Sequence, residues 1–62
     1  MKAAIYYNVY SEDGEEVASF LVGSDECGDE RTAERDARRE SDRRSKKFDA
    51  AYHVERIEEP FE

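Results

Sequence analysis

Residues 2–22 read KAAIYYNVYSEDGEEVASFLV and decide the fold, because two apolar runs flank an Asp-Gly pair. Residues 2–10 are rich in tyrosine and β-branched side chains and contain no glycine or proline, which is typical of a strand. Residues 16–22 have the same character. Asp13-Gly14 between such runs is the strongest short-range hairpin signal, since both turn residues tolerate a positive φ. We therefore predict an antiparallel hairpin that turns at this pair.

Alternation along the first predicted strand separates its side chains onto two faces of the sheet. One face holds Ile5, Tyr7 and Val9, which we expect to meet a helix. Tyr6 and Tyr10 then lie on an open face, where we predict a possible self-association surface. The residues of the second strand beside them are either Ala18, Phe20 and Val22 or Val17, Ser19 and Leu21, and the pattern favours neither set.

Residues 29–47 read DERTAERDARRESDRRSKK and are predicted to form one helix. Acidic residues begin this segment and basic residues end it, which matches the helix dipole. Three i,i+4 pairs have the favourable orientation and contribute about 0.2–0.5 kcal/mol each. These pairs are Glu34–Arg38, Glu40–Arg44 and Asp42–Lys46. We expect a narrow stripe to pack on the sheet, made of Ala33, Ala37, Ser41 and Phe48.

A third strand is predicted over residues 52–58, YHVERIE. Ile57 breaks the alternation that Tyr52 and Val54 begin, so we expect a bulge or a strand end nearby. Residues 59–62 are predicted to form a tail in which Pro60 stops ladder pairing. The expected fold is a single α+β domain over residues 1–62. It is a two-layer β-β-α-β arrangement, with one helix on one face of a three-stranded, mainly antiparallel sheet.

The sequence lacks the sets of residues that catalysis or tight metal binding would need. Cys27 is the only cysteine and His53 the only histidine of the 62 residues, so neither an internal disulfide nor a tetrahedral zinc set can form. His53 has no recognisable nucleophile partner, and the acidic residues of 24–30 lack the spacing of a calcium loop. We predict that the chain is not an enzyme and holds no metal or cofactor.

Membrane association is not expected, because no segment approaches the ~20 apolar residues that a spanning helix needs. The first ten residues, MKAAIYYNVY, contain one lysine and an interrupted apolar run, which is not the pattern of a signal peptide. We predict a cytoplasmic protein that makes no membrane contact.

Charge is distributed unevenly in a chain whose net charge is −7. Residues 31–47 contain eight basic and four acidic residues, a net charge of +4. Half of these cations have a carboxylate partner within the helix, so we do not predict direct nucleic-acid binding. The negative charge gathers in the hairpin turn, the linker and the C-terminal stretch. The predicted partner-binding residues are Glu12, Asp13, Glu15, Glu16, Asp25, Glu26, Asp29, Glu30, Glu55, Glu58 and Glu59.

Such carboxylates roughly match phosphates as partners of arginine and lysine, so the predicted partner is a basic protein surface. In size, acidity and one-helix architecture, the chain resembles small phage-encoded inhibitors, including anti-CRISPR proteins and other DNA mimics. The resemblance implies a stoichiometric blocker that acts in the host cytoplasm. Its target would be a basic, nucleic-acid-binding subunit of a host defence complex.

A second resemblance is carried by IYYNVYSEDGEEVASFLV at residues 5–22 and CGDERTAERDA at residues 27–37. The order of strand, Asp-Gly turn, strand, loop and helix is similar to antitoxins of the HicB type. It implies an antitoxin-like or self-associating structural module, either a monomer or a homodimer that pairs through Tyr6 and Tyr10. A generic acidic protein of a high-salt organism is the remaining alternative.

Overall fold

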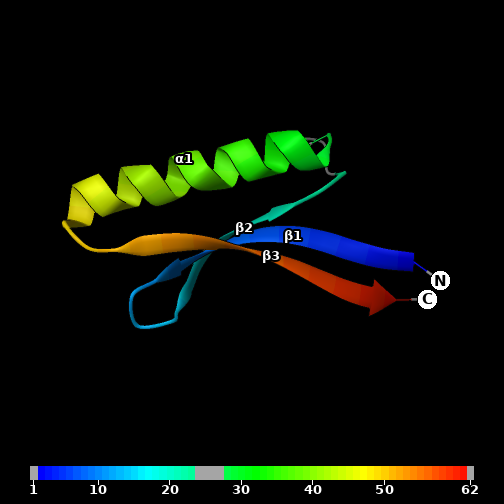
Figure 1. Ribbon diagram of the computed structural model, residues 1–62, viewed down its shortest axis with the longest axis horizontal. Helices are drawn as coiled ribbons and strands as arrows, with labels where there is room; N and C mark the ends of the chain where they lie inside the picture. Colours follow the sequence, from blue (N-terminus) through cyan, green and yellow to red (C-terminus); the bar gives the residue numbers. More distant parts are fainter. Residues whose placement is uncertain (1, 24–27, 62) are drawn as a thin grey trace.

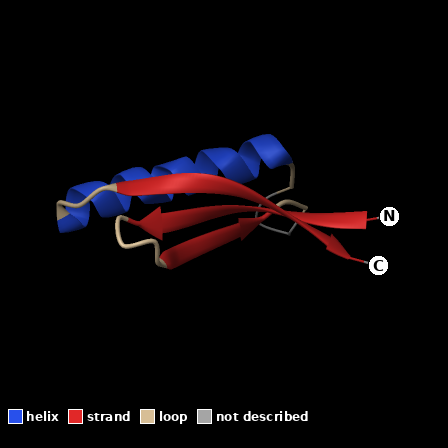
Figure 2. Cartoon of the chain, turned by 60° about the horizontal axis from the view of Figure 1, so that its bottom comes forward, coloured by secondary structure: helices blue, strands red, loops and turns tan. Residues whose placement is uncertain are grey.

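Three strands and one helix make up the part of the chain that the computed structural model describes, residues 2–23 and 28–61 (Figure 1). The elements are β1 (Lys2–Ser11), β2 (Glu16–Leu21), α1 (Glu30–Phe48) and β3 (Tyr52–Phe61). Figure 2 shows all three strands on one side of the helix. The predicted α+β fold of order β-β-α-β is therefore confirmed.

β1 is the central strand of a sheet with the order β2-β1-β3, and it pairs antiparallel with both neighbours. The β1–β2 register places Tyr7 opposite Phe20 and Asn8 opposite Ser19. Residues that face each other across a ladder lie on the same side of the sheet. Ser19 and Leu21 therefore share the open face with Tyr6, as one of the two predicted sets for β2 requires. Val17, the third member of that set, instead packs against the core, because the register is irregular beside it.

The hairpin turn differs from the predicted two-residue turn. Ser11 N donates to Glu15 O at 2.9 Å, and Gly14 N donates to Ser11 O at 2.9 Å, so the loop contains three residues. Gly14 has a φ of 86°, whereas Asp13 does not have a positive φ. A three-residue loop needs a left-handed residue only at its last position, and glycine adopts that conformation without steric cost.

Two predictions for β3 are wrong. Its register with β1 runs without interruption from Tyr52 to Phe61, so no bulge lies at Ile57. Ile57 instead faces Tyr6 on the open side of the sheet. Pro60 does not end the pairing, because it continues the strand opposite Ala3. β3 is an edge strand, where a residue without an N–H is tolerated if that position points away from the neighbouring strand. The irregular register lies in the other ladder, between Val9 and Tyr10 of β1.

The buried core is small and lies between β1 and α1. Val9, Ala33 and Ala37 are 0% exposed, and Tyr7 is 7% exposed. Alanine carries only a methyl group, so the helix can approach the sheet closely at these two positions. The predicted stripe does not extend to Phe48, which is 53% exposed at the end of α1 beneath the Lys47 ammonium group.

Candidate functional site

Three carboxylates gather in the β1–β2 turn. Glu12, Asp13 and Glu15 are exposed, and their side chains make no hydrogen bond or ion pair with another described residue. The turn lies at the opposite end of the molecule from residues 2 and 61 (Figure 1). Like charges so close in the chain repel one another, and a cationic partner would relieve that repulsion. The turn is therefore a projecting, uncompensated negative surface.

Glu30 was predicted to bind a partner, but its carboxylate is engaged within the fold. Glu30 Oε1 accepts hydrogen bonds from Arg56 Nε at 2.5 Å and from Tyr7 Oη at 2.7 Å. These donors, Arg56 first, lower the pKa of Glu30. The same carboxylate and the burial of the ring raise the pKa of Tyr7. Glu30 therefore connects α1 to β1 and β3.

Four other predicted partner-binding carboxylates also have internal contacts. Asp29 Oδ1 accepts from Thr32 N at 2.7 Å and caps α1, which lowers the Asp29 pKa. The other contacts are Asn8 Nδ2 to Glu16 at 3.1 Å, His53 Nε2 with Glu55 at 2.8 Å, and Arg56 Nη1 to Glu58 at 3.2 Å. Glu59 has no such contact among the described residues. Asp25 and Glu26 lie outside the described residues.

The basic residues of α1 are mostly paired with carboxylates of the same helix. The three predicted i,i+4 pairs are confirmed, at 3.0 Å for Glu34–Arg38, 2.6 Å for Glu40–Arg44 and 3.3 Å for Asp42–Lys46. Glu40 also accepts from Arg43, and this hydrogen bond is the main reason that the Glu40 pKa is lowered. Arg35 lies 3.5 Å from Asp36. Five of the eight cations of α1 are paired in this way, and Arg31, Arg39 and Lys47 have no ion pair among the described residues.

The open face combines an apolar end and a polar end. At the apolar end Tyr6 lies between Leu21 and Ile57 in the ladders, and Leu21 is 40% exposed. At the polar end the Tyr10 ring stacks on His53, with 5.5 Å between their centroids. Asn8 is only 7% exposed, although α1 covers the other face of the sheet. Its Oδ1 accepts a hydrogen bond from Ser19 Oγ at 2.7 Å. The Tyr10 ring is therefore already in contact with a neighbour on this face, whereas Tyr6 belongs to an exposed apolar patch.

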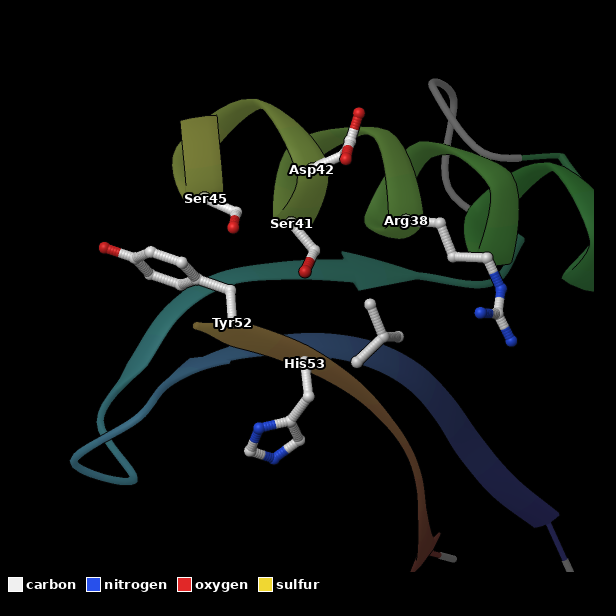
Figure 3. A pocket seen from close by; sticks show the side chains of 7 residues that line it. Arg38, Ser41, Asp42, Ser45, Tyr52 and His53 are labelled. Atoms are coloured by element: carbon white, nitrogen blue, oxygen red, sulfur yellow. The ribbon is translucent and has the colours of Figure 1, made fainter. Parts of the chain in front are cut away.

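A groove between α1 and β3 is a feature that the sequence analysis missed. It has a volume of about 440 Å³ and is lined by residues of both elements. Figure 3 shows Ser41 and Ser45 extending from α1 towards β3, while His53 points to the other side of the strand. The sequence feature that indicates the groove is the change from Ala33 and Ala37 to serine further along the same helix face. These serines supply polar groups to the lining of the groove.

We searched the described residues for metal-binding groups and for membrane-spanning helices. In residues 2–23 and 28–61 no group of three histidine, cysteine, aspartate or glutamate side chains could hold a metal ion. No helix in that part of the chain is long and apolar enough to cross a membrane. His53 contacts Glu55 and stacks on Tyr10. Cys27 lies outside the described residues.

Comparisons with family models, curated proteins and solved structures found no match to this chain.

Proposed function

We propose that this chain is a non-enzymatic binding protein that occupies a basic, nucleic-acid-binding surface of a partner protein. The observation that carries the proposal is the turn at Glu12, Asp13 and Glu15, which lies at one end of the molecule and whose carboxylates have no partner among the described residues. Carboxylates accept charge-assisted hydrogen bonds from arginine and lysine much as phosphate oxygens do. Complementary fields also speed the association of such surfaces.

The paired charges on α1 support the same proposal. A protein that bound nucleic acid directly would present uncompensated cations to the phosphates. Here Arg38, Arg44 and Lys46 each have a carboxylate within reach on the same helix. Arg31, Arg39 and Lys47 lack such a partner, but residues 2–23 and 28–61 hold fourteen carboxylates against ten cations. The net charge of the described chain is therefore negative, and the turn holds its largest group of unpaired carboxylates. A defence complex that handles nucleic acid is one class of partner with a suitable basic surface.

The test compares two immobilised forms of the chain in a pull-down from a cell lysate. One is the wild type, and the other carries Glu12→Gln, Asp13→Asn and Glu15→Gln. We expect only the wild type to capture basic proteins, and we expect the captured protein to lose binding to a labelled DNA duplex. A control variant with Glu34→Gln, Asp36→Asn and Asp42→Asn has the same net charge as the turn variant and should capture normally.

Three results would contradict the proposal: no capture, equal capture by the turn variant, or a captured protein that binds DNA unchanged when saturated with this chain. Salt gives an independent check, because exposed charges separated by more than a Debye length are strongly screened. Capture that persists unchanged at molar salt would exclude an electrostatic contact through the turn.

Self-association is the second candidate function, and the exposed Leu21 beside Tyr6 and Ile57 favours it. Apolar residues that adjoin on an uncovered sheet face can be buried by a second copy. We expect Tyr6→Ala to shift a dimer to a monomer in sedimentation equilibrium, with Tyr52→Ala, a substitution on the opposite face, as the control. A monomeric wild type at high concentration would contradict this candidate.

A further inference from the structure

The groove between α1 and β3 combines polar groups with an apolar floor. Figure 3 shows Ser41 directed towards the strand and Tyr52 at the beginning of β3. Neither hydroxyl has a hydrogen-bond partner among the described residues. Val54 is half-buried and also lines the groove. A ligand here would find two available hydroxyl groups and an apolar contact of about the size of a small aliphatic side chain.

The groove adjoins an unpaired strand edge. β3 has β1 on one side and no strand on the other side within the described sheet. Alternate residues of an edge strand direct their N–H and C=O groups outward, where an additional strand can pair with them. A groove between a helix and such an edge is the arrangement in which an extended peptide adds to a sheet and inserts alternate side chains.

The charges of β3 select the kind of peptide. Its ten residues hold three glutamates and one arginine, and Arg56 is already engaged by Glu30 and Glu58. Glu55 and Glu59 lie on the open face, opposite to the groove. An added strand would place one set of alternate side chains beside these two carboxylates and the other set in the groove.

We propose that the α1–β3 groove and the outer edge of β3 bind an extended basic peptide segment of a partner protein. The segment adds as a fourth strand, with alternating basic and small apolar residues. Its basic residues face Glu55 and Glu59, and its small residues enter the groove over Val54 beside Ser41. This surface is separate from the hairpin turn, and the inference does not depend on the carboxylates of that turn.

A second copy of the chain fits this edge less well. Two β3 strands paired antiparallel about a two-fold axis at Ile57 would place Glu55 opposite Glu59 of the other copy, both on the open face. Like charges directly opposite each other destabilise a ladder. Each strand carries an excess of carboxylates, so the pairing brings together two negative edges rather than complementary ones.

The probe is a synthetic peptide of four Lys-Val repeats with blocked ends, titrated by isothermal calorimetry and followed by amide hydrogen exchange. We expect it to bind and to slow exchange at alternate residues of β3 between Tyr52 and Glu59. A Glu-Val peptide of equal length should not bind. A Lys-Val peptide N-methylated at alternate residues, which loses the donors of one edge, should bind more weakly by about tenfold or more, the equivalent of about 1.4 kcal/mol.

Variants of the chain separate the groove from other acidic surfaces. Ser41→Phe fills the groove and should abolish binding, whereas Arg39→Phe on the solvent side of α1 should leave it unchanged. Glu55→Gln with Glu59→Gln should weaken binding without disturbing the core, even if Ser41→Phe fails to fold. The variant with Glu12, Asp13 and Glu15 neutralised should bind the peptide as the wild type does, even if the proposed function fails.

Several outcomes would overturn the inference. These are no binding of the Lys-Val peptide, equal binding of the N-methylated peptide, or binding without protection of β3 amides. Loss of binding in the turn variant alone would assign the peptide to the hairpin. Protection of β3 that depends on protein concentration, without peptide, would assign the edge to a second copy of the chain.

Discussion

Glu30 connects all the layers of this small protein through one carboxylate. It lies in the first turn of α1 and accepts from Tyr7 on β1 and from Arg56 on β3. Both donors favour the ionised form, so the folded protein holds the proton of Glu30 less tightly than the unfolded chain does. Protonation of this one group therefore weakens the attachment of the helix to the sheet.

Acid should destabilise the fold for this reason. The pKa of Glu30 lies below its ordinary value of 4.5 in the folded state, and the pKa values of Asp29 and Glu40 are lowered too. Stability from these groups is complete above their unfolded pKa values and is lost as the pH falls through the lowered ones. Urea unfolding between about pH 7 and about pH 3 should show this decline. Glu30→Gln should reduce the slope below pH ~4.5, and an identical slope would contradict the assignment.

Ala37 should not tolerate a larger side chain. It is 0% exposed where α1 meets the sheet, and added methylene groups in a packed core cost about 1–3 kcal/mol. We expect Ala37→Leu to lower the free energy of unfolding by that amount in urea titrations. Arg39→Leu makes a comparable change on the exposed side of the same helix and should have little effect. Equal effects of the two substitutions would show that Ala37 is not a point of close approach.

Among the elements, the β1–β2 turn depends on one backbone conformation. Gly14 has a φ of 86° and its missing Cβ would meet no atom within 4 Å, so only the conformation resists substitution. Gly14→Ala should lower the free energy of unfolding by about 1–2 kcal/mol, the cost of a left-handed residue with a side chain. Gly28→Ala is the matched control, because that site is equally open and has no positive φ. Similar losses in both variants would contradict this account.

At the scale of the whole molecule, the long β1–β3 ladder should have graded stability. It extends from Ser11 and Tyr52, near the end of α1, to Lys2 and Phe61, while β2 pairs only as far as Tyr6. Amide exchange should therefore be slowest at Asn8 and Val9 and much faster at Ala3 and Ala4. Regions with few buried contacts open at lower free energy than the core does. Uniform protection along β1 would contradict this gradient.

Much of this architecture could be predicted from local patterns. Residues 2–10 alternate as a strand should, and the three i,i+4 pairs of α1 follow from helical spacing alone. The wrong predictions concern β3, where the outcome depends on the place of the strand in the sheet. Pro60 is compatible with pairing because β3 is an edge strand, and the pattern of one strand does not reveal its place in the sheet. Ile57 breaks the alternation of Tyr52 and Val54 because it lies on the open face, opposite Tyr6, and not because the strand bulges.

The candidate surfaces were predicted less completely, for a related reason. Sequence shows that a carboxylate exists but not which partner it already has. Glu30 and Asp29 belonged to the predicted binding set, although one anchors the helix to the strands and the other caps it. Glu12 and Asp13 have no side-chain partner in residues 2–23 and 28–61, because they lie in a projecting turn. The α1–β3 groove was missed because it forms only when Ser41 and Val54, far apart in the chain, come together.

The antiparallel pairing of β1 with β3 brings Lys2 and Phe61 side by side at one end of the molecule (Figure 1). A mechanical load applied through these two residues would act across the ladder, along the direction of its hydrogen bonds. The bonds would then open one pair at a time, as in a zipper, rather than resist together in shear. The protein should extend at low force in an optical trap, beginning at Ala3 and Pro60, before the core around Val9 is disturbed.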